Sequence, residues 1–446
     1  MVLRYGITHL IRGAELSGRR RLAKPRKGVS LLKQNSRAKI ALCLRTHGPL
    51  SKAQISRMTG LSITCVCDTA NELVSEGALV ETGTIAGPRG RPMVLLTINP
   101  NGSPVAGVRL APEAIEIAVA TPTIDVLARR VISYDPLSQS IESTVDAIAD
   151  AIRRCAAAAD TDVSALSGVG IAVHGMVDPV LGVIEEMTNR PGWEQVPITR
   201  MIEERLQLPV VADNCVRAGA ITYQWFNSER RAGGTLYLAI AEGVGAALMY
   251  DQEIARGIHH SGNQLGHVII DPDGPLCACG NHGCLEAFCS DLSFARRLWP
   301  DVVRAAVDMT FEQREGLVRR GFELARAGDE KAVQALDDVI DHLGIGIANG
   351  VALFGSRTII VLGTLIDLAP SLIVDEIRKA ALKYVHERDR GIEIRAALNC
   401  REFLLRGAIG LVLCRPYREL REESLSLGQW EGPHSGTPSG STRVGG

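Results

Sequence analysis

The sequence predicts an α/β protein in which a winged helix-turn-helix module precedes a larger body of two lobes. Helix signatures followed by two short strands fill the first hundred residues, and from Pro104 onward apolar strands alternate with helices. The charge is divided in the same way. Residues 1–100 hold 16 Lys and Arg against 5 Asp and Glu, whereas the remaining chain holds 33 against 45. A basic segment on an acidic body indicates that one end of the chain meets nucleic acid.

The composition of the chain is typical of a folded protein and excludes a disordered or membrane-spanning one. Its 446 residues suit two or three domains, and 46% of them are hydrophobic. No apolar run is long enough to span a bilayer, and the N-terminus lacks the apolar core and cleavage site of a signal peptide. We therefore expect a cytoplasmic protein without a membrane partner. In that compartment its 11 cysteines are first interpreted as metal ligands where they cluster, because disulfides are rare there.

The two ends of the chain have compositions that favour disorder. Residues 1–28 carry six closely spaced basic side chains, which are Arg19, Arg20, Arg21, Lys24, Arg26 and Lys27. They predict a basic, disordered arm that is either solvated or in contact with phosphates. Residues 418–446 are expected to form a disordered tail, since their distal part is rich in Ser and Gly and has little to bury.

Residues 29–98 are predicted to form the winged helix-turn-helix domain. Apolar residues at helical spacing mark a first helix that ends at Gly48. Ser51 can cap a second helix, Gly60 makes a short turn, and Ser62 can cap a third helix. Two short strands complete the pattern, as in winged helix-turn-helix modules.

The third helix and the loop after it are the expected DNA-binding elements. Hydroxyls at the start of a recognition helix suit contacts to phosphates or base edges. The strands, Ala78–Glu81 and Met93–Thr97, flank the run Pro88-Arg89-Gly90-Arg91-Pro92, which is similar to the core of an AT-hook. This run fits a narrow minor groove, and a solvated loop is the alternative. The residues expected to contact double-stranded DNA are Ser51, Ser62, Thr64, Arg89, Gly90 and Arg91.

The body alternates strands with helices, which is typical of an α/β architecture. Apolar runs predict strands at Val105–Leu110, Ile115–Ala120, Val169–Val173, Val210–Ala212, Leu236–Ile240, Ala246–Tyr250 and Ile359–Leu362. Helices are predicted between them, including Ile141–Ala158 and Ala332–Ala352. We expect these elements to form two lobes.

A cluster of one imidazole and three thiols predicts a metal site in the second half of the body. The donors are His267, Cys277, Cys279 and Cys284. Three thiolates and an imidazole complete a closed tetrahedral zinc set, so the Zn²⁺ ion would be structural and would not activate water. Gly280 and Gly283 allow the tight turns that such a loop needs, and His282 and Cys289 are spare donors. Accidental clustering of reduced cysteines is the alternative.

Together with the winged-helix pattern, this metal motif resembles a known family. Four stretches are similar to segments of the ROK family (repressors, open reading frames and sugar kinases): GVGIAVHGMVDPVLGVI from Gly168, TNRPGW from Thr188, LPVVADNCVRAGA from Leu208 and GHVIIDPDGPLCACGNHGCLEAFCS from Gly266. Over roughly residues 30–415 the chain is identified as a member of the regulator branch of that family.

The resemblance implies a two-lobed, actin-like fold of the sugar kinase type with a cleft between the lobes. Lobe 1 would comprise residues 103–227, completed by a C-terminal helix at about 395–417. Lobe 2 would comprise residues 228–394 and hold the zinc site. Family repressors work as dimers or higher oligomers, which implies a homodimer or higher homo-oligomer here and a bacterial protein that lies on the nucleoid when bound to DNA.

The resemblance also implies what a kinase of this family needs, and the chain departs from it at three places. In the run that matches the first phosphate turn, Arg109–Glu113, Pro112 removes an N–H donor and Glu113 adds a repelling charge. The second phosphate turn is matched by Ala241-Glu242-Gly243, which puts a carboxylate where phosphate oxygens would lie. Cys215 replaces the general-base Asp. We therefore expect no enzyme activity, with a zinc-containing, ATP-dependent sugar kinase as the alternative.

A pocket for sugar hydroxyls is implied by the same resemblance. Family positions that contact sugar are matched by Asn189, Asn214, His267 and Glu286, and Gln264 replaces a family Glu. We therefore expect a transcription regulator, most simply a repressor, whose DNA affinity is set by a sugar-type or sugar-phosphate effector or by a protein partner. A decayed pocket in a regulator that has no small ligand is the remaining alternative.

Overall fold

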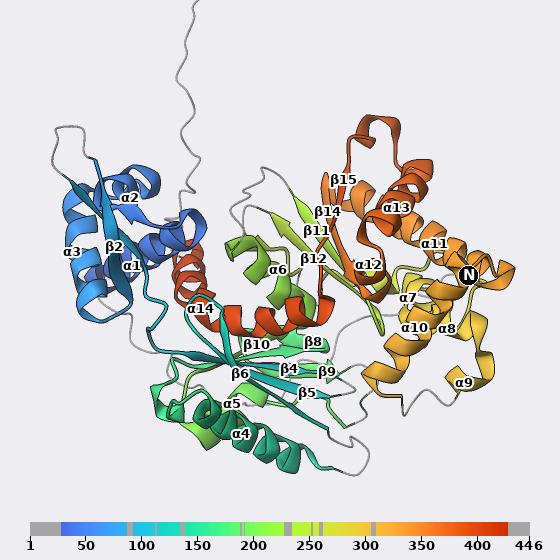
Figure 1. Ribbon diagram of the computed structural model, residues 1–446, viewed down its shortest axis with the longest axis horizontal. Coiled ribbons are helices and arrows are strands. Elements are labelled where there is room, and N and C mark those ends of the chain that lie inside the picture. The colour runs from blue at the N-terminus through green and yellow to red at the C-terminus, as the bar shows by residue number, and fades with distance from the viewer. Residues whose placement is uncertain are drawn as a thin grey trace, which may run out of the picture.

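The computed structural model describes residues 28–86, 92–111, 114–133, 139–187, 190, 192–226, 234–250, 253–257, 262–304 and 309–426. They form a small N-terminal module and a body built on two five-stranded sheets (Figure 1). No helix within these ranges is long and apolar enough to cross a membrane. The expected basic arm up to residue 27 and the wing residues 87–91 lie outside the described residues.

The module contains three helices and a three-stranded sheet. The helices are α1 (Gly28–His47), α2 (Lys52–Thr59) and α3 (Ile63–Ser75), and the strands in spatial order are β1 (Leu50–Ser51), β3 (Met93–Ile98) and β2 (Leu79–Ile85). Ser51 and Gln54 form a reciprocal capping box on α2, and the Ser62 hydroxyl accepts the N–H of Cys65 at 3.2 Å. Gly60 has a φ of 72°, the left-handed conformation that lets α2 end and the chain turn into α3. The winged helix-turn-helix prediction is confirmed, and β2 continues beyond its predicted end.

The lobe 1 sheet has the strand order β10-β7-β4-β5-β6. Its strands are β4 (Val105–Leu110), β5 (Ile115–Ala120), β6 (Val126–Ile132), β7 (Val169–Val173) and β10 (Val210–Asn214). One face of the sheet is covered by α4 (Ile141–Ala158) and α5 (Ile198–Leu206), with the short helix η1 (Val163–Ala165) and the hairpin β8 (Gly175–Asp178) and β9 (Val183–Met187) nearby (Figure 1). Three predicted strands and one predicted helix coincide with β4, β5, β7 and α4 at both ends.

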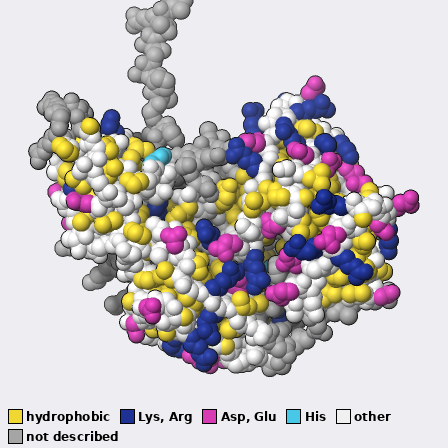
Figure 2. All heavy atoms as spheres, in the orientation of Figure 1, with side chains coloured by type: hydrophobic (Ala, Val, Ile, Leu, Met, Phe, Trp, Pro, Cys, Tyr) yellow, Lys and Arg dark blue, Asp and Glu magenta, His cyan; other side chains and the backbone are white. Residues whose placement is uncertain are grey.

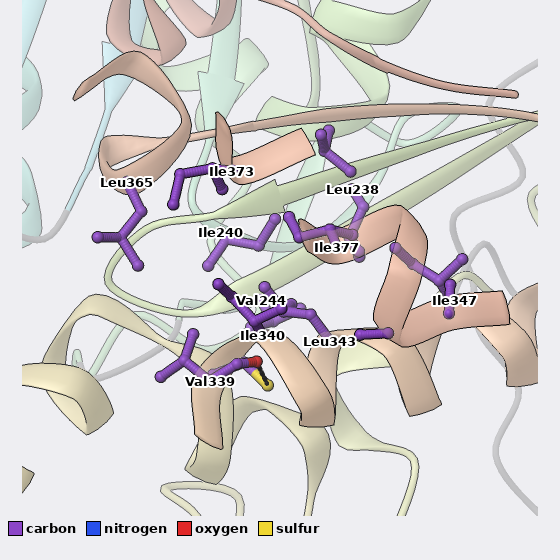
Figure 3. Close-up of a cluster of buried hydrophobic side chains, with 14 of the residues drawn as sticks. Leu238, Ile240, Val244, Val339, Ile340, Leu343, Ile347, Leu365, Ile373 and Ile377 are labelled. Carbon is purple, nitrogen blue, oxygen red and sulfur yellow. Dashed lines mark hydrogen bonds between the residues drawn. The ribbon is translucent and has the colours of Figure 1, made fainter. Parts of the chain in front are cut away.

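The lobe 2 sheet has the strand order β13-β12-β11-β14-β15. Its strands are β11 (Thr235–Ile240), β12 (Val244–Tyr250), β13 (Glu253–Ile254), β14 (Thr358–Gly363) and β15 (Glu393–Ala396). The helices of this lobe are η3 (Leu265–His267), α7 (Leu285–Cys289), α8 (Asp291–Leu298), α9 (Pro300–Arg304), α10 (Phe311–Arg326), α11 (Glu330–Phe354), α12 (Thr364–Leu368), α13 (Pro370–Tyr384) and η5 (Glu387–Asp389). Leu238, Ile240 and Val244 of the sheet share a buried core with Leu343 and Ile347 of α11 (Figure 3).

The two sheets share one topology. In each, the first strand in sequence lies in the middle, the second and third follow on one side in antiparallel order, and the fourth and fifth lie on the other side in parallel order. The central strands of both sheets are buried along their whole length, which is why continuous apolar runs mark them in the sequence. This repeated arrangement confirms the two-lobed, actin-like body.

Two helices, α6 (Cys215–Phe226) and α14 (Cys400–Ser426), lie between the two sheets (Figure 1). Their side chains share one buried cluster with residues from both sheets. The helices approach each other closely at glycines. A Cβ on Gly219 would overlap the Phe403 ring, and a Cβ on Gly407 would lie 2.5 Å from the Gly219 nitrogen. Because neither position has room for a side chain, α6 and α14 pack as one rigid pair.

The C-terminal helix differs from its predicted bounds of 395–417. Residues 395 and 396 belong to β15, where they pair with β14, and α14 begins only at Cys400. The helix then continues to Ser426, so residues 418–426 of the expected disordered tail are helical. These nine residues include Arg, Glu and Leu, which are good helix formers, whereas the Gly residues and most of the Ser residues that predict a disordered tail lie beyond them. Residues 427–446 lie outside the described residues.

Candidate functional site

A cleft of about 1030 Å³ lies between the lobes and is lined by elements of both sheets. The first residues of α6 and α14, Cys215 and Cys400, form part of its wall. In Figure 2, charged side chains of both signs gather in the middle of the visible face, between the two sheets. Four of the five residues expected to contact an effector line this cleft, namely Asn214, Gln264, His267 and Glu286. The fifth, Asn189, lies outside the described residues.

The four predicted metal donors lie together at the lobe 2 side of the cleft. The donor atoms of His267, Cys277, Cys279 and Cys284 are all within 4.8 Å of one another. The sulfurs of Cys279 and Cys284 are 3.6 Å apart, and the Cys277 sulfur is 3.7 Å from Nδ1 of His267. Two thiolates on one tetrahedral zinc ion, each at about 2.3 Å from it, are separated by about 3.7 Å. The donor set therefore fits a tetrahedral ion such as Zn²⁺.

The backbone of the metal loop folds back on itself to place these donors. Gly280 and Gly283 have φ values of +89° and +71°, so both predicted glycine turns are left-handed. The Cys277 N–H donates to the Asn281 carbonyl at 2.8 Å, which closes the turn between the cysteines. Burial raises the pKa of the Cys277 thiol to about 12. Metal binding at this site would therefore release a proton, since thiolate is the ligand form.

The two spare donors do not belong to the cluster. His282 is exposed, and its Nδ1 lies 3.0 Å from the Gly274 carbonyl oxygen. Cys289 is fully buried in the lobe 2 core and donates its thiol hydrogen to the Val339 carbonyl at 3.6 Å. Burial also raises the pKa of Cys289. Neither residue is among the four donors that lie together.

Glu286 connects the metal loop to the second turn of the cleft. Its Oε2 accepts the N–H of Val244 at 2.9 Å, directly after the Ala241-Glu242-Gly243 turn. Its Oε1 accepts a hydrogen bond from the Cys277 thiol at 3.8 Å. The carboxylate is thus held between the metal loop and β12, where a cleft ligand can reach it.

Asn214 has a structural task besides lining the cleft. Its Oδ1 accepts the N–H groups of Val216 and Arg217 at 3.0 and 3.2 Å, which caps the start of α6. Its Nδ2 donates to the Gly175 carbonyl at 2.9 Å. The adjacent Cys215 is 6% exposed and lines the cleft. These contacts fix Asn214 in a single orientation toward the cleft.

In the Ala241-Glu242-Gly243 turn, a carboxylate is paired with an arginine. Oε2 of Glu242 lies 3.4 Å from Nη1 of Arg314 on α10, and both side chains are largely buried. Of the run Arg109–Glu113, Arg109 to Ala111 are described, and Pro112 and Glu113 are not. Arg109 is buried and forms an ion pair with Glu116. Both residues lie on strands that are otherwise mostly apolar, so the sequence pattern did not indicate this pair.

The start of α3 presents two of the residues expected to contact DNA. Ser62 and Thr64 are exposed, whereas Val66, Ala70 and Leu73 of the same helix are buried in the module core. The expectation for Ser51 is wrong, because its side chain is 1% exposed and its hydroxyl is held by Gln54 within the capping box. Arg89, Gly90 and Arg91 of the predicted wing lie outside the described residues.

One arginine joins the module to the body. Arg45 of α1 donates from Nη1 to the Leu413 carbonyl of α14 at 2.6 Å, and its guanidinium lies 5.7 Å from the centre of the Phe226 ring at the end of α6. Burial lowers the pKa of Arg45. Leu42 of α1 enters the same buried cluster as α6 and α14. The module therefore rests on the end of α6 and the middle of α14, the two helices whose first residues line the cleft.

Comparison with known proteins shows named repressors among the relatives of this chain. It is 29% identical over 358 residues to the putative xylose repressor of a Caldicellulosiruptor species, with 79% of this chain and 89% of that protein covered. It is 25% identical over 327 residues to the xylose repressor of Bacillus subtilis, covering 73% and 81%. The identity with the N-acetylglucosamine repressor of Escherichia coli O157:H7 is 23% over 340 residues, covering 76% and 82%.

Two solved structures have the same fold. A ROK family transcriptional regulator, described as a homologue of the Escherichia coli MLC protein, matches with a TM-score of 0.71 and 22% identity over 88% of this chain and 100% of that one. A ROK family glucokinase from Streptomyces griseus, solved with glucose and AMPPNP, matches with a TM-score of 0.57 and 26% identity over 69% and 98%. The model of the ROK family matches residues 105–414, which is most of the body, and the chain therefore belongs to the ROK family.

Proposed function

We propose that this protein is a transcriptional repressor whose affinity for double-stranded operator DNA is set by a small ligand in the cleft. The observation that carries this proposal is the attachment of a winged helix-turn-helix module to the two helices that line the cleft. Relatives named as repressors over most of the chain support it. We further propose a homodimer or higher homo-oligomer, since helix-turn-helix proteins read two-fold operators.

The ligand is proposed to be of the sugar type, held by hydrogen-bonding groups on the cleft wall. Asn214 and Glu286 present a fixed amide and a fixed carboxylate, and Gln264 offers both a donor and an acceptor to hydroxyl groups. Asn189, which matches a sugar-contacting position of the family, is proposed to join them. A structural Zn²⁺ held by His267 and the three cysteines would fix the loop that carries this wall.

A rigid path connects the cleft to the module. The twelve residues of α6 rise about 18 Å from the cleft to Phe226, where Arg45 of α1 contacts the ring. α14 also begins in the cleft wall, and its Leu413 carbonyl accepts the other contact of Arg45. Closure of the lobes around a ligand would tilt both helices together, because they pack without space between them. The same tilt would reorient the module on its operator.

The wing provides a test of the DNA-binding part. Replacing Arg89 and Arg91 together by alanine is expected to weaken binding about tenfold or more and to flatten any preference for A·T-rich flanks, because arginines in a minor groove read its width and potential. The measurement is fluorescence anisotropy with a duplex that the full-length protein has selected from a random pool. Arg153→Ala, which removes an exposed arginine from α4 of the body, is the matched control. A double variant with full affinity and an unaltered flank preference would refute the wing assignment.

A sugar kinase is the second candidate, and the likeness to a glucokinase structure favours it. Against it, the Glu242 carboxylate and its partner Arg314 take the place of a phosphate-binding turn, and a thiol replaces the general base at Cys215. We expect sugar-dependent ATP turnover to be no greater than in a Cys215→Ala variant. The loss of a positioned base typically costs about 10²–10⁴ in rate, so turnover that uses Cys215 as the base would fall clearly in that variant. Wild-type turnover well above that of Cys215→Ala, for any sugar in a broad panel, would show that the protein is a sugar kinase.

A further inference from the structure

One side of α3 lies outside the module core. The buried residues of the opposite side are Val66, Thr69, Ala70 and Leu73. Thr64, Asp68 and Asn71 are exposed and follow one another at spacings of four and three residues, so they lie on one face of the helix. In Figure 1, α3 lies on the outer side of the module, away from the two sheets of the body. We call Thr64, Asp68 and Asn71 the exposed row of α3.

The charge of α3 is the opposite of that expected for a helix that meets phosphates. The helix contains no lysine or arginine, and its two acidic residues are Asp68 and Glu72. Glu72 is neutralised by α1, because its Oε1 lies 2.8 Å from Nζ of Lys33 and its Oε2 lies 3.7 Å from Nη1 of Arg37. The Asp68 carboxylate forms no hydrogen bond or ion pair with any residue that the structure describes. Its charge is therefore not compensated by the described part of the chain.

An unpaired carboxylate is unfavourable in a DNA interface unless a base donates a hydrogen bond to it. Phosphates repel it, and a carboxylate can only accept hydrogen bonds. In the major groove guanine presents two acceptors, thymine presents an acceptor and a methyl group, and adenine presents the acceptor N7 beside its amino group. Cytosine presents only its N4 amino group, which donates. Asp68 therefore favours cytosine over the other three bases.

The next residue of the exposed row supplies a donor beside this acceptor. Nζ of Lys52, the first residue of α2, donates to Oδ1 of Asn71 at 2.6 Å. Because its oxygen is engaged, Asn71 has its Nδ2 group left to donate to a base. Residues three apart on a helix have Cβ atoms about 5–6 Å from each other, so Asp68 and Asn71 can reach one base pair. A C·G pair presents the cytosine amino donor beside the guanine O6 acceptor, which matches this acceptor and donor.

We propose that Asp68 selects the operator by accepting a hydrogen bond from the N4 amino group of a cytosine in the major groove. On other sequences the same carboxylate meets base acceptors or phosphates, and it lowers the affinity of the protein for them. Asp68 thus weakens binding to DNA in general and creates a preference for one base pair. The inference rests on the proposed function, in which the module binds operator DNA, and it names the base that α3 selects.

Selection from a random pool of duplexes by the full-length protein tests this assignment. The wild type should select duplexes with a cytosine at one fixed position, and its preference for cytosine there should be about tenfold in competition binding. Asp68→Ala should accept every base at that position. Asp68→Asn should select adenine there, because an amide pairs with N6 and N7 of adenine.

Affinity for an unrelated duplex gives an independent readout. Both Asp68 variants should bind that duplex about threefold or more tightly than the wild type at low salt, since a charge that phosphates repel is removed. Asp150→Asn is the matched control, because Asp150 is also an exposed acid but lies on α4 of the body. It should select and bind as the wild type does. All three variants should unfold at the wild-type temperature, because exposed side chains contribute little stability.

Two results would overturn the inference and leave the DNA-binding function intact. One is an Asp68→Ala protein that selects the same sequences as the wild type, which is what a solvated surface acid would give. The other is a position that depends on Asp68 but holds a base other than cytosine in the wild-type selection. A wild type that selects no duplex overturns the proposed function and this inference together, so the two failures are distinguishable.

Discussion

A Cys279→Ser variant is expected to lose bound zinc and to unfold about 10 °C below the wild type. Cys279 is exposed, so exchange of its sulfur for oxygen neither opens a cavity nor buries a polar group. Any large loss of stability must then come from the missing ion. Structural zinc contributes about 10–16 kcal/mol in small finger peptides, and less is expected in a lobe that already has a packed core. A loss of about 4 kcal/mol corresponds to roughly 10 °C in a domain of this size.

The matched control for this variant is His282→Ala. His282 lies in the same loop and is exposed, but it is not among the four clustered donors. It should keep one zinc ion per chain and the unfolding temperature of the wild type. A chelator added to the wild type should reproduce the Cys279→Ser midpoint. Zinc analysis and thermal unfolding check both expectations, and a Cys279→Ser protein with full zinc content or an unchanged midpoint would contradict the structural zinc.

Replacing Arg45 by methionine is expected to uncouple the cleft from the module. The change removes the hydrogen bond to the Leu413 carbonyl and the cation above the Phe226 ring but keeps a long apolar stem in the same space. Allosteric ligands typically change affinity by about 5–150-fold, and in Arg45→Met we expect the change in DNA affinity to fall below about threefold. Ligand affinity at the cleft should then become independent of DNA, because coupling is reciprocal. Anisotropy titrations measure the DNA affinity with and without ligand, and the ligand affinity with and without DNA.

Arg45→Lys separates coupling from simple loss of structure. Lysine keeps the positive charge and one hydrogen-bond donor for the Leu413 carbonyl, so part of the ligand response should return. Both variants should bind DNA in the absence of ligand, since Arg45 is not in the exposed face of α3. An Arg45→Met protein that binds DNA and responds to ligand as strongly as the wild type would show that the signal takes another route.

The parts of the fold that the sequence predicts well are those in which one physical signal dominates. β4, β5 and β7 are buried on both faces, so each appears as an uninterrupted apolar run. Ser51 and Ser62 cap the N-termini of α2 and α3. Each cap needs only one hydroxyl at one position, so the sequence alone indicates where each helix begins. The four metal donors are also a local signal, because three of them lie within one short loop and glycines permit its turns.

Other elements depend on contacts between distant residues and leave little local trace. β6 is an exposed edge strand that contains two arginines, so neither an apolar run nor clean alternation marks it. The ion pairs of Glu116 with Arg109, Arg129 and Arg401 join β4, β5, β6 and α14, which only the folded chain brings together. At Ser51 the local signal is clear, but it fits two different roles. The sequence predicts that its hydroxyl contacts DNA, but the helix cap that the same hydroxyl makes buries it.

Control of DNA affinity by a ligand in the cleft is tested most directly by one equilibrium measurement on the full-length wild type. A duplex selected by the protein from a random pool is titrated with and without a compound that thermal shift has shown to saturate the cleft. A repressor released by its effector should bind the duplex at least about fivefold more weakly with the ligand present. Equal affinity with the cleft empty and filled would contradict ligand control, and failure to select any duplex would contradict the DNA-binding function itself.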